Sequence, residues 1–212
     1  MQVQTKQPQQ AEESLNRAIA INKDYLPAIV LLAQLQGATG QTAKSIELYQ
    51  RAIDLSPRDP RLQVLLGGLY ERIGNWQQAE AVYQKVLTMD AENAIASNNL
   101  AYLMLEHGGS PSVALTLAQT ARKGLPKLAN AADTLGWAYY NNGGYSVAAP
   151  LLEEAVKATP NNQSYRYHLG LTYQKLNDPL RAKAELEKAI ALNPSSPLAE
   201  QARHSLSQLA GG

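Results

Sequence analysis

The 212-residue sequence contains no cysteine, which excludes disulfides, thiolate zinc sites and cysteine nucleophiles. Phenylalanine is also absent, and the 11 tyrosines take positions that phenylalanine usually fills. The sequence has no apolar run of about 18 residues, the length that a membrane-spanning helix requires. The 19 basic residues nearly balance the 18 acidic ones, so the sequence gives no electrostatic indication of nucleic-acid binding. What remains is a chain that is 45% hydrophobic, enough for a continuous core.

A leucine followed by a small residue recurs along the chain with a nearly constant spacing of 34, 34, 35 and 34 residues. The pairs are Leu32-Ala33, Leu66-Gly67, Leu100-Ala101, Leu135-Gly136 and Leu169-Gly170. Prolines at 57, 126, 160 and 194 follow the same period, with Ala91 where one proline is missing. A fixed period of this length is typical of a stack of repeats, each of which is one supersecondary unit.

Each period contains the start and stop signals of two helices. Capping side chains precede a proline at Asp59-Pro60, Ser110-Pro111, Asp178-Pro179 and Ser196-Pro197, which predicts helix starts. Glycines 40, 74, 108 and 143, with Asn177 in the last repeat, separate the two helices of a repeat and predict left-handed turn residues. We expect eleven helices and no strand.

Small residues on facing helices predict close packing within a repeat. Gly67 is expected to face Ala79, and Gly136 to face Ala148, so that the two backbones of each pair approach closely. A larger residue at either alanine is expected to force the helices apart, at a cost of about 1–3 kcal/mol.

The combined pattern resembles the tetratricopeptide repeat (TPR) over about residues 11–196, with its leucine-glycine, tyrosine, glycine, alanine and proline positions. The resemblance implies an all-α fold, a right-handed α-solenoid of TPR helix-turn-helix repeats. Residues 98–126 and 132–160 are also similar to long bacterial TPR proteins associated with exopolysaccharide export and exosortase-type sorting. That similarity implies a bacterial cytoplasmic, periplasmic or cell-envelope location, and the polar first ten residues do not form a secretory signal.

The register of the repeats predicts the organisation of the chain. Residues 1–10 are expected to be a disordered or tag-like tail, and residues 11–25 the second half of a truncated repeat. Residues 197–212 are expected to be a terminal capping helix, as a solenoid needs to cover its last apolar face. Five complete repeats lie between, at 26–59, 60–93, 94–128, 129–162 and 163–196. The chain then corresponds to the C-terminal part of a longer repeat protein.

The first helix of each repeat presents one face away from its partner helix, and in TPR proteins this face lines a concave groove. From the repeat at 94–128 onward the face carries aromatic and polar residues, whereas the repeat at 60–93 has Val64, Gly68 and Glu71 there. The candidate partner-binding residues are Asn98, Asn99, Tyr102, Asp133, Trp137, Tyr140, Tyr167 and Leu171. Aromatic side chains are favoured binding anchors, and asparagine and aspartate can bond an extended backbone. The alternative is that these aromatics only pack between neighbouring first helices.

We expect no catalytic residues, no metal site and no cofactor. His107, His168 and His204 fall in different repeats; His107 is expected to lie at a helix C-terminus and His168 to be a satisfied interface residue. The predicted function is a protein-interaction scaffold that binds an extended segment or helix of a partner in the groove. The alternatives are a glycan-handling module of an exopolysaccharide system and a self-assembling array. Self-association is expected through residues about 8–36, where Leu15 and Ile19 lack a preceding helix.

Overall fold

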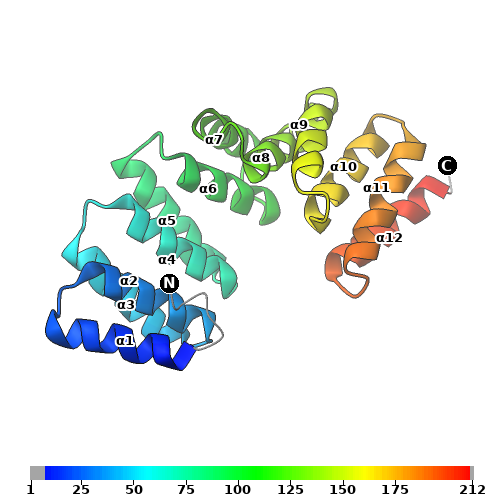
Figure 1. Ribbon diagram of the computed structural model, residues 1–212. Coiled ribbons are helices and arrows are strands. Elements are labelled where there is room, and N and C mark those ends of the chain that lie inside the picture. Colours follow the sequence, from blue (N-terminus) through cyan, green and yellow to red (C-terminus); the bar gives the residue numbers. More distant parts are fainter. Residues whose placement is uncertain (1–7, 211–212) are drawn as a thin grey trace. The chain divides into compact units, whose positions relative to one another are not determined.

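The computed structural model describes residues 8–210, which form twelve α-helices and no strand (Figure 1). The expected count of eleven helices is wrong, because the five helix pairs are accompanied by one additional helix before them and one after them. The first helix also begins at Pro8, so residues 8–10 are helical and not part of a tail. The rest of the proposed tail lies outside the described residues.

The chain divides into two compact units, residues 1–91 and 92–212. Unit 1 contains α1 (Pro8–Ile21), α2 (Leu26–Ala38), α3 (Thr42–Leu55), α4 (Pro60–Arg72) and α5 (Trp76–Met89). Unit 2 contains α6 (Ala94–Glu106), α7 (Pro111–Gly124), α8 (Ala129–Asn141), α9 (Tyr145–Ala158), α10 (Gln163–Lys175), α11 (Pro179–Leu192) and α12 (Pro197–Ala210). We call α2, α4, α6, α8 and α10 the first helices of the repeats, and α12 takes the same place after the last pair.

Helices begin at all four prolines expected from the sequence, and a side-chain cap bond forms at three of these starts. The Asp59 carboxylate accepts a hydrogen bond from the backbone N–H of Arg61, and the Asp178 carboxylate accepts one from the backbone N–H of Arg181. The Ser196 hydroxyl accepts one from the backbone N–H of Ala199. Ser110 differs, because its hydroxyl lies 3.0 Å from the hydroxyl of Ser112 and makes no cap bond. The proline at the start of α7 therefore defines that helix without a side-chain cap.

The turn between the two helices of each repeat uses a left-handed residue, as the sequence predicts. The four glycines at 40, 74, 108 and 143 have φ between +75° and +80°, and Asn177 takes the same place with φ of +58°. Asparagine tolerates this conformation better than most residues with a side chain, which explains its use in the last repeat.

The core of each repeat forms around small residues of the first helix. A Cβ atom on Gly136 would lie 2.7 Å from Leu152 Cγ and 3.3 Å from the Ala148 carbonyl oxygen. A Cβ atom on Gly67 would lie 2.5 Å from the ring of Tyr83. The close approach expected of Gly136 to Ala148 is therefore confirmed, and a buried aromatic ring also packs against Gly67.

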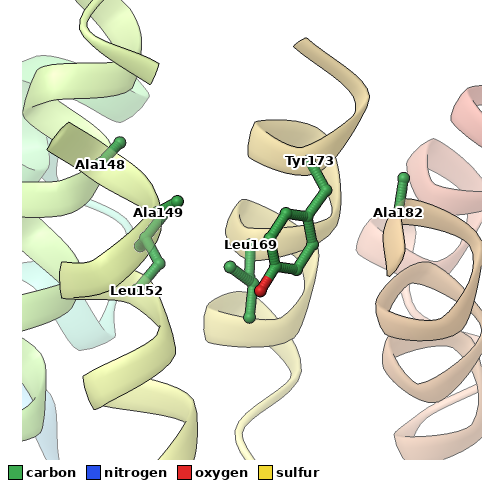
Figure 2. Packing of buried hydrophobic residues seen from close by; sticks show 6 residues of the cluster. All are labelled: Ala148, Ala149, Leu152, Leu169, Tyr173 and Ala182. Carbon is green, nitrogen blue, oxygen red and sulfur yellow. The ribbon is translucent and has the colours of Figure 1, made fainter. Parts of the chain in front are cut away.

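One core cluster of unit 2 joins three consecutive helices (Figure 2). Leu169 and Tyr173 on α10 lie between the α9 residues and Ala182 on α11. The α9 contribution is Ala148, Ala149 and Leu152. The apolar layer is thus continuous from one repeat to the next.

Helix contacts in both units are local along the chain. Every substantial contact joins helices that are adjacent or next but one. In unit 2 the first helices also contact one another, α6 with α8, α8 with α10 and α10 with α12. Among the described residues, no helix is long and apolar enough to cross a membrane.

Candidate functional site

A cavity of about 500 Å³ opens against the first helices of unit 2. Its walls come from three of these helices and from the start of α12. We call it the first-helix cavity, and its lining residues are Tyr102, Leu105, Glu106, Trp137, Gln163, Ser164, Tyr167, His168, Ser196, Pro197, Leu198 and Gln201. The lining combines aromatic rings, amides and hydroxyls, which together can contact both the side chains and the backbone of a bound segment.

Trp137 on α8 is held in an aromatic stack. Its ring lies 4.1 Å from the His168 ring at an interplanar angle of 8°, and 4.6 Å from the Tyr140 ring at 17°. Tyr145 meets Tyr140 edge-on at 5.3 Å. Such contacts contribute about 0.5–1.5 kcal/mol each beyond the burial of apolar area. Trp137 therefore has a packing role as well as a place on the cavity wall.

His168 on α10 and Asp133 on α8 form a buried pair across the two helices. His168 Nδ1 lies 3.0 Å and 3.2 Å from the two carboxylate oxygens of Asp133. The residues are only 3% and 2% exposed. The expectation that His168 is a satisfied interface histidine is therefore confirmed, and Asp133 is its partner.

Glu106, the last residue of α6, ties that helix to α8. Its Oε1 accepts a hydrogen bond of 3.0 Å from the indole N–H of Trp137. The carboxylate also acts on Tyr167: burial is the main cause that raises the pKa of this tyrosine, a hydrogen bond with Ser205 lowers it, and the charge of Glu106 raises it.

Burial also raises the pKa of other tyrosines near this stack. It raises the pKa of Tyr140 to about 12, with smaller contributions from Tyr145 and Tyr167. It also raises the pKa of Tyr165 to about 12, and the negative charge of Asp133 adds to that effect. These phenols stay protonated at neutral pH, so they act as neutral hydrogen-bonding groups and ring surfaces.

The structure brings three of the eight candidate binding residues to the cavity: Tyr102, Trp137 and Tyr167. Two others support them from behind, Asp133 through His168 and Tyr140 through the stack. Tyr140 also packs against the core cluster of α9 and α10, so it is partly a core residue. The remaining three, Asn98, Asn99 and Leu171, do not line the cavity. Asn98 is 5% exposed and donates to Asn99 Oδ1 at 3.3 Å.

Sequence reasoning missed Glu106 and the contribution of α12. Glu106 follows the periodic positions of α6 by one residue, and only its bond to Trp137 reveals its place. Pro197, Leu198 and Gln201 belong to a segment that the sequence predicts to be a cap. Because α12 repeats the register of a first helix, that register was the available signal.

The other two histidines are not among the cavity-lining residues. His107 follows α6 as its C-terminal cap, as the sequence predicts, and His204 Nε2 lies 3.0 Å from the side-chain nitrogen of Gln208 on the surface of α12. In the part of the chain that the structure describes, no three histidine, aspartate or glutamate side chains gather so that they could hold a metal ion.

The paired helices, the left-handed turn residues and the 34-residue period define an α-helical repeat protein. The tetratricopeptide repeat family model matches residues 30–94, 69–129 and 134–197, which is most of the chain. The chain therefore belongs to the tetratricopeptide repeat family.

Two relatives show how far the likeness extends. BBSome complex member BBS4 of Bos taurus is 27% identical over 189 residues, which is 89% of this chain and 36% of that protein. Cellulose synthase operon protein C of Xanthomonas axonopodis pv. citri (strain 306) is 28% identical over 217 residues, which is 95% of this chain and 14% of that protein. The chain thus spans about a third or less of the length of these relatives.

Solved structures with the same fold include YrrB, described as a TPR protein with an unusual peptide-binding site. It covers 91% of this chain and 99% of its own, with 22% identity and a TM-score of 0.66. The Pseudomonas aeruginosa pilF structure covers 96% of this chain and 92% of its own, with 16% identity and a TM-score of 0.79. At these identities the likeness establishes the fold alone.

Proposed function

We propose that the chain is a non-catalytic protein-interaction scaffold, and that unit 2 binds an extended segment of a protein partner in the first-helix cavity. The observation that carries the proposal is the cavity itself, where three consecutive first helices and α12 place aromatic, amide and hydroxyl groups around one hollow of about 500 Å³. Concave sites of this size with a few converging polar groups are the usual form of binding sites.

The composition of the cavity supports an extended peptide as the ligand. Tyr102 and Tyr167 supply rigid rings that lose little conformational entropy on binding. The exposed Gln201 supplies an amide group that can both donate to and accept from a peptide backbone, whereas the Gln163 nitrogen already donates to the Ala189 and Asn193 carbonyls. The peptide-binding site named for the similar YrrB structure is consistent with this use of the fold.

Selection from a library of random short peptides displayed on phage tests the proposal. Peptides that bind the wild-type protein are expected to lose most of their affinity for Tyr102→Ser, because truncation of an aromatic anchor costs about 2 kcal/mol or more. Tyr25→Ser is the matched control, since Tyr25 is an exposed tyrosine of unit 1.

The choice of Tyr102 over Trp137 follows from the contacts. Trp137→Ala removes the stack on His168 and the bond to Glu106 together, so it changes the cavity wall as well as the binding surface. Selected peptides that bind Tyr102→Ser as tightly as the wild type would place the binding surface elsewhere and overturn the proposal.

A second candidate is glycan binding, favoured by the relatives named cellulose synthase operon protein C. Aromatic rings beside amides and hydroxyls can also stack sugars. In a Trp76→Phe background Trp137 is the sole tryptophan, so its fluorescence reports on the cavity. Saturable quenching or a spectral shift with cello-oligosaccharides supports the glycan candidate, and an unchanged spectrum at high sugar concentration removes it.

A further inference from the structure

Charge is distributed unevenly around the first-helix cavity. Among the described residues its lining contains one carboxylate, Glu106, and no lysine or arginine. His168 is the lining residue that could carry a positive charge, but it is 3% exposed and bonded to the Asp133 carboxylate. Because His168 contacts that carboxylate, it supplies no unpaired cation to the cavity. The cavity is therefore negative.

The cation next to Tyr167 in the sequence does not change this sign. Arg166 precedes Tyr167 on α10, but its guanidinium bonds the Glu185 carboxylate and the Pro160 carbonyl. Both side chains of the Arg166–Glu185 pair are 13% exposed. The charge of Arg166 is thus neutralised within unit 2, and Glu106 remains the ionic group that a ligand meets.

The Glu106 carboxylate is held by one hydrogen bond and can accept more. The Trp137 indole donates to its Oε1 at 3.0 Å, and Trp137 is itself held between Tyr140 and His168 contacts. A carboxylate offers about four acceptor sites on its two oxygens, so one indole N–H leaves most of them available. A ligand that donates two parallel hydrogen bonds matches this geometry.

The remaining walls suit a flat cation on an apolar stem. Tyr102 and Tyr167 supply aromatic rings, which attract cations, and Leu105 and Leu198 supply aliphatic surface. Arginine has a planar guanidinium that binds carboxylates through two N–H groups and stacks on rings, and its methylene stem packs on apolar side chains. Lysine shares the charge but has no planar fork.

We propose that the first-helix cavity is specific for an arginine side chain of the bound partner segment, which Glu106 binds and Tyr102 and Tyr167 flank. This inference rests on the proposed function and deepens it, because it names the residue that the partner must supply.

Four peptide pools test the inference, each with random flanks and a fixed central arginine, lysine, leucine or glutamate. Binding is measured by fluorescence anisotropy on the whole chain. The arginine pool is expected to bind best, the lysine pool next, and the leucine and glutamate pools about tenfold or more weaker than the arginine pool, as loss of a charge-assisted hydrogen bond predicts.

Glu106→Gln is the central variant, because glutamine keeps an acceptor for the Trp137 indole and removes the charge. It is expected to lose about tenfold in affinity for the arginine pool and little for the leucine pool. Glu187→Gln is the matched control: it removes the same charge from an exposed position of α11 that does not line this cavity.

The outcomes separate the inference from the proposed function. Equal binding of all four pools, lost in Tyr102→Ser, overturns the arginine inference and leaves the binding site in place; no binding of any pool overturns both. If circular dichroism shows that Glu106→Gln is less stable, the salt dependence of the wild type decides. Affinity for the arginine pool that falls with added salt, beside an unchanged leucine pool, supports the inference, and equal dependence overturns it.

Discussion

The two units build their first helices from different residues in the same register. In unit 1, α4 carries Val64, Leu65 and Gly68 where unit 2 carries Asp133 on α8, His168 on α10 and Tyr102 on α6. The first helices of unit 2 also approach one another, whereas the described residues of unit 1 contain no first-helix contact of comparable extent. Because unit 1 forms the same helix pairs without these groups, the fold does not require them. The polar and aromatic surface of unit 2 is therefore not a requirement of the fold, as its proposed binding role predicts.

The largest expected effect comes from breaking the buried pair of unit 2. Asp133→Ala leaves His168 buried without its partner, and loss of one member of such a pair costs about 3–5 kcal/mol of unfolding free energy. Denaturant unfolding in the Trp76→Phe background measures the change, with Trp137 as the reporter of unit 2.

A double variant sharpens this comparison. Asp133→Val with His168→Leu places the residues of unit 1, Val64 and Leu65, at the same positions of unit 2. Because it leaves no unpaired polar group, it is expected to be more stable than Asp133→Ala. A double variant as unstable as the single one would show that the pair's shape, and not its polarity, stabilises α8 and α10.

A smaller effect is expected from a methyl group added above a core glycine. Gly67→Ala in unit 1 places a Cβ 2.5 Å from the rigid, buried ring of Tyr83, and overpacking of this kind costs about 1–3 kcal/mol. Gly136→Ala in unit 2 meets the more adaptable Leu152 at 2.7 Å and is expected to cost less.

The neighbouring residue Gly68 provides the control for this pair. A Cβ there would lie 3.9 Å from the Tyr83 hydroxyl, so Gly68→Ala is expected to stabilise α4 by about 0.5–1 kcal/mol through its higher helix propensity. Thermal unfolding followed by circular dichroism compares the three variants. Equal destabilisation by Gly67→Ala and Gly68→Ala would contradict the packing in α4.

Alkaline pH is also expected to weaken unit 2. Burial raises the pKa of Tyr140 and Tyr165 to about 12, and also that of Tyr173, with help from its hydrogen bond to Glu153. Between their unfolded pKa, about 10, and about 12, the folded state keeps protons that the unfolded state releases, so stability is unaffected below pH 10 and falls as the pH rises through this window.

Unfolding at several alkaline pH values measures this slope. Tyr140→Phe is expected to make the decline of unit 2 less steep, because phenylalanine does not titrate. Trp137 fluorescence reports on unit 2 in the Trp76→Phe background, and Trp76 reports on unit 1 in the Trp137→Phe background. A decline that Tyr140→Phe leaves unchanged would assign the slope to other groups.

The smallest expected effect concerns the surface of α1. Leu15 and Ile19 are only half-buried there, and Ile21 is 89% exposed. We expect concentration-dependent self-association through residues about 8–36, measured by light scattering, and Leu15→Glu should reduce it. A chain that stays monomeric at all concentrations contradicts this prediction, and Leu180→Glu, at an exposed leucine of unit 2, is the control.

The fold was largely predictable because one period repeats across the chain. Leu135 and Gly136 fix the first helix of their repeat, and Gly143 fixes its end, so local signals and the global register agree. The helical periodicity also places Tyr102, Trp137 and Tyr167 on one side of the first helices, and their binding role stays a prediction.

Side-chain pairing between repeats was less predictable. From its helix face, Asp133 is predicted to hydrogen-bond an extended ligand. In the structure its carboxylate instead contacts His168, which lies one period away in the sequence. The spacing of 35 residues between the two was a usable signal. The sequence contained no such signal for Glu106, because its hydrogen bond with Trp137 depends on how the last turn of α6 lies beside α8. Periodicity defines a face of a helix, whereas rotamers and helix ends decide which atoms meet.

The restriction of helix contacts to adjacent or next-but-one helices has a kinetic consequence. Residues that touch are separated by little more than one repeat, so the relative contact order of the chain is low, and chains of low contact order fold fast. Each helix pair can find its partners as soon as the next pair has been synthesised, because none of its substantial contacts within a unit awaits a distant part of the sequence. Translation from the N-terminus therefore lets the units fold in order, so that the nascent chain exposes little apolar surface.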